Sequence, residues 1–385
     1  TTVVDMPLNC IPATTTPEAV QGKRDACPTP AVDVGMWGGA VAGGLAGLPE
    51  LLRTGVHGAK AFMIDSGVDW FDALETDDGL RDAMRACATE GVPLLVHAED
   101  AAEAAAAPFP TAVRYLDLVR SRPPSCEVRA IERLAALAQE TGAHVHIVHV
   151  TAAEAVEALA SAQAAGIHIT GETCPHYLHF AAEDIPDADP RFKCFPPIRD
   201  RSHQDALWAG LHAGTLSLIV SDHSPAPWAI KDTGNLATGW GGIGSIQVSF
   251  PATWTSARER GIPLERVVGW MATAPAAMAG LASKGRIEVG LDADLVAFAP
   301  DASFTVRGTE LLHRHPQTPY DERRLFGVVR ETWLRGRRVD PSTPHGGWLM
   351  RDTSVAEPPA AAVPSIDAPA SPSFTAASQS GVPAS

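Results

Sequence analysis

The sequence predicts an α/β fold of the (β/α)8 barrel type, in which parallel strands alternate with helices. Short apolar, β-branched runs recur as far as residue 222, and Ala- and Leu-rich stretches with apolar residues at helical spacing lie between them. Seven such runs are present, so the pattern supplies seven of the eight βα units of a closed barrel and lacks the first. The runs expected to be strands cover residues 2–6, 31–37, 58–64, 92–98, 144–150, 167–173 and 216–222.

The intervening helices and the C-terminal part follow from the same patterns. Helical periodicity is clearest at 77–90, 126–140, 152–165 and 202–213, and a further helical region covers about 246–282. The sequence GRIEVGLDADLVAFAP at 285–300 instead predicts short strands with glycine turns. We therefore expect a barrel over 1–284, the remnant of a small β-domain over 285–350, and a disordered Ala-, Pro- and Ser-rich tail over 353–385.

Composition excludes several classes of partner. The formal net charge is −15 over 385 residues and the basic residues are scattered, which argues against nucleic acid as a partner. Apolar residues make up 45% of the chain, yet no uninterrupted apolar run reaches the length of a membrane span. The six cysteines form no CxxC pair, and the N-terminus lacks the pattern of a secretory signal, so a cytoplasmic protein is expected.

Four polar residues lie in or at the ends of the predicted strands, where a parallel barrel has its active site. They are Lys60, His97, His149 and Asp222. Each alone has an ordinary explanation: a strand lysine reaches to water, a core histidine is hydrogen-bonded, and an aspartate caps the next helix. Together, two imidazoles, a carboxylate and a buried amine are nitrogen and oxygen ligands that suit Zn²⁺ or a similar divalent ion.

The lysine fits this chemistry only if it loses its charge. Burial lowers the pKa of a lysine, and a neutral amine can add CO₂ to form an anionic carbamate with two oxygens. A carbamate on Lys60 could bridge two metal ions, which lower the pKa of a shared water and stabilise an oxyanion. Asp222 could then take the proton of that water and pass it to a departing ring nitrogen.

An ordered set of motifs resembles the allantoinases, a branch of the metal-dependent cyclic amidohydrolases. The resemblance covers about residues 1–340, and it is carried by VDMPLNCIPATTT (4–16), HGAKAFMIDSGVD (57–69), LLVHAE (94–99), HIVHVTAAEA (146–155), GETCPHYL (171–178), KCFPPIRD (193–200), SDHSPAP (221–227) and WGGIGSIQ (240–247). It implies a metallohydrolase barrel that opens the cyclic amide of allantoin to give allantoate, in purine catabolism.

The resemblance also implies roles for individual residues. Lys60 matches an N6-carboxylysine that bridges two Zn²⁺ ions, His97 and His149 match ligands of one ion, and Asp222 matches a catalytic aspartate that also binds the other. Backbone groups of four residues would hold the substrate ring, and they are Ser66, Phe195, Gly241 and Gly242. Phe195 stands where the family usually has a small residue, so an altered pocket wall is expected. Similar enzymes are commonly homotetramers, which suggests an oligomer.

One part of the family pattern is missing from the sequence. The family places a His-x-His pair at the end of its first barrel strand, before the VDMPLN motif, and no such pair precedes it here. Two ligands of the second ion are thus absent, and a catalytic Zn²⁺ normally has about three. We expect the second ion to be weakly held and the chain as given to be poorly folded or nearly inactive.

Other interpretations remain open. Hydantoinase or dihydropyrimidinase activity would use the same ring-opening chemistry, a non-catalytic homologue could have lost its metals, and a binding protein could use the barrel mouth without chemistry. Period-two alternation predicts that His144 and His146 face the helices, away from His149. His176 and His223 could orient a ligand or simply pack, and Cys174 and Cys194 are expected to be packing residues.

Overall fold

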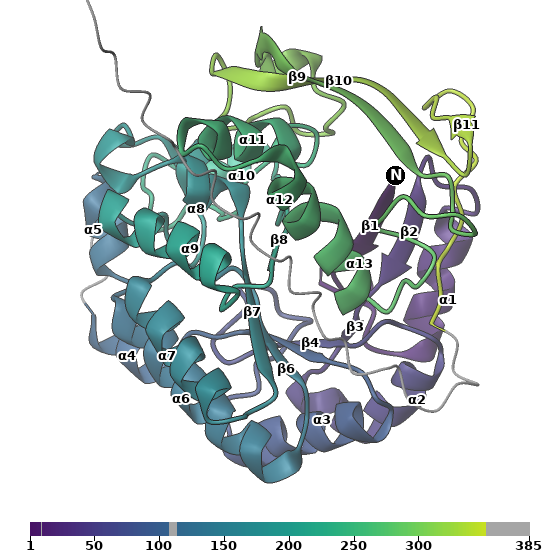
Figure 1. Cartoon of the computed structure of the whole chain (residues 1–385). Coiled ribbons are helices and arrows are strands. Elements are labelled where there is room, and N and C mark those ends of the chain that lie inside the picture. The colour runs from purple at the N-terminus through teal and green to yellow at the C-terminus, as the bar shows by residue number, and fades with distance from the viewer. Residues whose placement is uncertain (9, 108–113, 352–385) are drawn as a thin grey trace, which may run out of the picture.

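The fold is described from a computed structural model that covers residues 1–8, 10–107 and 114–351. The predicted disordered tail over 353–385 lies outside the described residues. In Figure 1 the strands of the first two thirds of the chain lie inside a layer of helices, and the C-terminal strands form a separate sheet beside them.

Parallel strands occur in all seven runs predicted to contain them. β2 and β3 are separated only by Trp37; β2 pairs with β1, and β3 begins a parallel sheet of order β3-β4-β5-β6-β7-β8. Among the described residues no ladder joins β8 to β1. The parallel α/β architecture is therefore confirmed. The strands are β1 (Thr2–Asp5), β2 (Asp33–Met36), β3 (Gly38–Gly39), β4 (Ala59–Phe62), β5 (Leu94–His97), β6 (Val145–Ile147), β7 (Ile169–Thr173) and β8 (Leu218–Ile219).

Helices connect the strands and pack against one another on the outside, where α3 contacts α6, α6 contacts α7 and α7 contacts α9. α6 illustrates the local causes: Pro124 starts it, Gly142 ends it at a φ of 71°, and its buried residues recur at helical spacing. The helices are α1 (Pro17–Ala26), α2 (Leu48–Arg53), α3 (Asp77–Thr89), α4 (Ala101–Ala106), α5 (Tyr115–Arg120), α6 (Pro124–Thr141), α7 (Ala153–Ala164), α8 (Pro175–His179), α9 (Arg201–Ala213), α10 (Trp228–Lys231), α11 (Ser249–Glu259), α12 (Leu264–Val268) and α13 (Ala274–Met278).

The C-terminal region forms an antiparallel sheet of order β11-β10-β9, from β9 (Leu295–Thr305), β10 (Arg324–Leu334) and β11 (Arg337–Arg338). α11 packs against β10, and the indole of Trp254 donates a hydrogen bond to the Pro300 carbonyl. The glycine-rich part of the 285–300 segment consists of turns, and regular strand begins only at Leu295.

An ion cluster with a buried lysine at its centre ties this sheet to the parallel strand β2. We call it the Lys284 cluster, and it comprises Lys284, Asp33, Asp292, Asp294 and Arg335. The Lys284 ammonium lies 2.7 Å from the carboxylate of Asp33, 3.0 Å from that of Asp292 and 2.8 Å from that of Asp294. Arg335 also pairs with Asp33. Burial lowers the pKa of Lys284, but the hydrogen bonds to the carboxylates outweigh it and raise the pKa above its usual value.

Two further observations bear on the setting of the protein. All six cysteines are free thiols, and Cys87, Cys126, Cys174 and Cys194 are buried. Within the described ranges, no helix combines the length and the apolar character needed to cross a bilayer.

Candidate metal and active site

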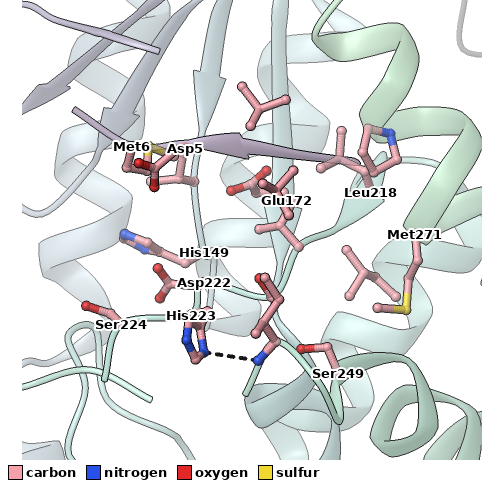
Figure 2. A pocket seen from close by; sticks show the side chains of 18 of the residues that line it. Asp5, Met6, His149, Glu172, Leu218, Asp222, His223, Ser224, Ser249 and Met271 are labelled. Carbon is pink, nitrogen blue, oxygen red and sulfur yellow. Dashed lines mark hydrogen bonds between the residues drawn. The ribbon is translucent and has the colours of Figure 1, made fainter. Parts of the chain in front are cut away.

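A cavity of about 2230 Å³ opens at the carboxyl ends of the parallel strands. All eight residues predicted for the site line it, and they are Lys60, Ser66, His97, His149, Phe195, Asp222, Gly241 and Gly242. Figure 2 shows His149, Asp222 and Glu172 around this space, with Asp5 and Met6 on one wall and Met271 on another. The fold thus brings together residues that lie far apart in the sequence.

Lys60 is buried inside β4 and has little to balance a positive charge. Its side chain is 3% exposed, and its amine donates a hydrogen bond to the Ala61 carbonyl at 3.0 Å and lies 3.8 Å from the centre of the Phe62 ring. Burial lowers the pKa of Lys60 to about 7, against the opposing effect of the carboxylates of Asp222 and Glu172. A large share of the amine is therefore neutral at physiological pH, which is the form that can react with CO₂.

The two histidines lie close together, with ring centres 4.6 Å apart. His97 ends β5, and its Nε2 lies 2.7 Å from Glu99 Oε2. Its Nδ1 is therefore the ring nitrogen left to bind a metal ion. His149 follows β6, and its Nδ1 is buried with no hydrogen-bond partner among the described residues. Burial lowers the pKa of both imidazoles well below its usual value, so both are neutral and able to bind a metal.

Glu99 was not predicted as part of the site. It is fully buried, and besides His97 it contacts the guanidinium of Arg122 at 3.5 Å. A carboxylate bound to the outer nitrogen of a histidine fixes the tautomer and orientation of the ring, as seen around many metal sites. Its position two residues after His97 was a usable signal, because residues at that spacing on an extended segment share a face.

Asp222 follows β8 and has an unusual backbone conformation. Its φ is 41° and that of His149 is 43°, in the left-handed region that non-glycine residues rarely adopt. Such conformations cost free energy and cluster at functional sites. Burial, together with the nearby Glu172 carboxylate, raises the pKa of Asp222 to about 6, against the opposing effect of Lys60. The Asp222 carboxylate is thus mostly ionised at neutral pH but can accept a proton readily.

The prediction that His144 and His146 both face the helices is wrong for His146. His146 pairs in register with Leu95, which lines the cavity, and its Nε2 lies 3.1 Å from the cavity residue Glu172. The positive φ of His149 breaks the two-residue alternation at the strand end. The direction of the His149 side chain therefore does not predict the direction of the His146 side chain.

The predicted substrate-binding residues form part of the cavity wall. The Phe195 ring lies under the Arg122 guanidinium at 4.5 Å from the ring centre and near the Lys193 ammonium at 5.2 Å. Gly242 has a φ of 117°, and a Cβ there would lie 2.2 Å from the Ser224 carbonyl oxygen, so only glycine fits. Its N–H donates to Lys193 O at 2.8 Å, whereas the Ser66 hydroxyl donates to Phe71 O at 2.8 Å.

The available donors are of the kind that hold a divalent cation. His97 and His149 are neutral imidazoles, Lys60 can supply carbamate oxygens, and Asp222 supplies a carboxylate. The unpartnered Nδ1 of His149 is a buried polar atom that a bound ion would satisfy. Nitrogen and oxygen ligands in this number suit Zn²⁺ with a position left open for water or substrate.

Comparison with known proteins agrees with this geometry. Residues 1–339 match the amidohydrolase family. The chain belongs to the amidohydrolase family. Within it, the chain is 46% identical to an allantoinase of Streptomyces avermitilis, with 91% of this chain and 80% of that protein aligned. It is 40% identical to an allantoinase of Arabidopsis thaliana, with 88% and 70% aligned.

Solved amidohydrolase structures resemble the fold closely. The L-hydantoinase (dihydropyrimidinase) of Arthrobacter aurescens superposes with a TM-score of 0.85 at 28% identity, over 91% of this chain and 81% of that one. Together with the allantoinase relatives, this similarity identifies the chain as an amidohydrolase of the cyclic-amide type, in the allantoinase group. The resemblance inferred from the sequence motifs is confirmed.

Proposed function

We propose that this amidohydrolase opens the hydantoin ring of allantoin by hydrolysis of its cyclic amide bond, giving allantoate. The observation that carries the proposal is the meeting of Lys60, His97, His149 and Asp222 at one cavity, in a chain whose relatives are named allantoinases. An unactivated amide needs both a strong nucleophile and stabilisation of the developing negative charge. The donor set and the aspartate could meet these two needs.

Divalent ions, most suitably Zn²⁺, would be held by these side chains. Lys60 as N6-carboxylysine, His97 and His149 would hold one ion, and Lys60 and Asp222 would contribute to a second. When bound, such ions lower the pKa of a water and stabilise an oxyanion. Among the described residues the first position has three ligands and the second has two, so the first ion should be held more tightly.

Asp222 would move the proton in this reaction. Its carboxylate takes a proton from the attacking water and donates it to the ring nitrogen as the amide bond breaks. In the metal-free protein, burial raises the pKa of this carboxyl above its ordinary value, which favours its acceptance of a proton from water. Glu99 keeps His97 in one orientation throughout.

The substrate ring would lie against the wall formed by Ser66, Phe195, Gly241 and Gly242. The Phe195 ring, which lies near the Arg122 and Lys193 cations, would contribute an apolar surface, and peptide groups of this wall would offer donors and acceptors to the ring amides. Hydantoin or dihydropyrimidine ring opening is the second candidate, because the structural relatives include an enzyme named L-hydantoinase (dihydropyrimidinase).

A substrate panel tests the proposal. The purified chain of residues 1–385, loaded with Zn²⁺ in bicarbonate buffer, is offered allantoin, hydantoin and dihydrouracil, and ring opening is followed for each. We expect kcat/KM to be at least about tenfold higher for allantoin. Asp222→Asn should lower the rate by about 10²–10⁴-fold, the range for loss of a general acid–base group.

Asp78→Asn is the matched control, because Asp78 carries the same charge but lies exposed on α3. It should leave the rate unchanged. Faster opening of hydantoin than of allantoin would transfer the assignment to the second candidate. Equal rates for Asp222→Asn and the unmodified chain would remove the proposed role of Asp222.

A further inference from the structure

A second cluster of side chains that could bind a metal adjoins the cavity at Asp222. It comprises Cys174, His176 and Asp222, whose ligand atoms all lie within 4.8 Å of one another. Cys174 follows β7 directly, Pro175 then starts α8, and His176 is on the first turn of that helix. The end of β7 and the end of β8 are neighbours in the sheet, which brings Asp222 to the other two. Only Asp222 also lines the cavity.

His176 is the observation that points to a ligand. Its side chain is fully buried, and neither ring nitrogen has a hydrogen-bond partner among the described residues. A buried imidazole normally satisfies at least one of its nitrogens, because leaving a polar group unpaired costs about 1–3 kcal/mol. One face of the ring is already occupied by Tyr177, with ring centres 4.1 Å apart. A cation bound by Cys174, His176 and Asp222 would give one of the His176 ring nitrogens a partner.

We propose that Cys174, His176 and Asp222 form a binding site for a thiophilic divalent cation such as Cd²⁺. One thiolate, one imidazole and one carboxylate are a ligand set that such ions accept, with a fourth position for water. Bonds of about 2.0–2.3 Å place ligands roughly 3.5 Å apart, so the side chains close by about one ångström on binding. The Cys174 thiol releases its proton to solvent as the sulfur–metal bond forms.

Occupation of this site would inhibit the enzyme. An ion held by Cys174 and His176 would draw the Asp222 carboxylate away from the cavity, where it contributes to the second ion and accepts the proton of water. This consequence rests on the proposed function, whereas the binding site itself does not. The thiolate makes the site selective, since Lys60, His97 and His149 offer only nitrogen and oxygen donors.

Spectroscopic titration tests the site without any substrate. The metal-free chain of residues 1–385 is titrated with Cd²⁺, and the thiolate-to-cadmium charge-transfer absorbance in the ultraviolet is recorded. We expect one saturable transition that disappears in Cys174→Ser, and an affinity at least about tenfold lower in His176→Gln and in Asp222→Asn. Cys87→Ser is the matched control, because Cys87 is an equally buried free thiol in α3, and it should keep the transition.

The outcomes separate the binding site from its consequence. An unchanged transition in Cys174→Ser, or unchanged affinity in His176→Gln with native circular dichroism, overturns the site. In Zn²⁺-loaded chain, Cd²⁺ should inhibit the unmodified protein at lower concentrations than it inhibits Cys174→Ser. Equal inhibition of both would overturn the inhibitory role but leave the site standing. A chain inactive towards allantoin would still show the transition.

Discussion

Lys60 and Lys284 are equally well buried, at 3% and 5% exposure, but they lie in opposite electrostatic surroundings. Lys284 contacts three carboxylates at 2.7–3.0 Å, and its pKa is raised. The Lys60 amine donates a hydrogen bond to one carbonyl, and burial lowers its pKa to about 7. Burial alone therefore does not decide the charge of a lysine; the partners within hydrogen-bond distance do.

The difference shows that a buried lysine can serve the fold at one position and a reactive site at another. The Lys284 cluster joins β2 to the segments around the C-terminal sheet through paired charges. Around Lys60 the groups are instead held unpaired or strained, as the Nδ1 of His149 and the positive φ of Asp222 illustrate. An active site is where a protein tolerates such local costs, since they keep the reactive groups available.

Replacing Lys60 gives the largest expected effect. Lys60→Met keeps the length of the side chain but cannot form a carbamate, so hydrolysis of allantoin should fall by more than about 10³-fold. The free energy of unfolding of the metal-free protein should not decrease, because a poorly paired buried amine is replaced by an apolar group. Steady-state kinetics and urea denaturation measure the two effects. Substantial destabilisation would show that Lys60, like Lys284, serves the fold.

Lys284→Met should have the opposite effects: it should lower the free energy of unfolding and leave activity nearly unchanged. Removing the ammonium leaves the buried Asp33 and Asp294 carboxylates without the cation they share, although Arg335 still pairs with Asp33. The free energy of unfolding should therefore fall by about 3 kcal/mol. At a temperature where the variant remains folded, kcat should stay within a few-fold of the unmodified value. The loss of stability is measured from the shift in the midpoint of chemical denaturation. A variant as stable as the original would remove the contrast between the two lysines.

Glu99→Gln should have a smaller effect on the site. The amide can still hydrogen-bond to His97 Nε2 but no longer carries the charge that favours one orientation of the imidazole. We expect Zn²⁺ affinity and activity to fall by about 10–100-fold, measured by competition with a chelator and by steady-state kinetics. Glu103→Gln, on the adjacent α4 and bonded to Ser125, is the control. Parallel losses in both variants would mean that the effect is not specific to His97.

The strand runs could be predicted because they depend on local patterns, and Lys60, His97, His149 and Asp222 stood out as polar residues in or at the ends of those runs. The other four candidate site residues came from the family resemblance. The cavity collects all eight since parallel strands place their carboxyl ends at one edge. The direction of His146 could not be predicted, because the positive φ of His149 depends on tertiary packing. The pairing of Lys284 with Asp33 joins residues 251 positions apart and leaves no periodic signal. The same holds for the approach of Cys174 and His176 to Asp222.

The pH dependence of stability gives the smallest effect and separates the lysines most directly. The folded-state pKa of Lys60 is about 7 and its ordinary value 10.5, so between these values the unfolded chain binds more protons and stability rises with pH. From pH 7.5 to 8.5 this gain should be about 1 kcal/mol in the metal-free protein. The folded-state pKa of Lys284 is raised, so its stabilising contribution is complete below 10.5 and constant across this interval. Lys60→Met should therefore abolish the rise while Lys284→Met retains it, as measured by urea denaturation at both pH values. The same rise in both variants would assign it to other groups and leave the Lys60 amine charged.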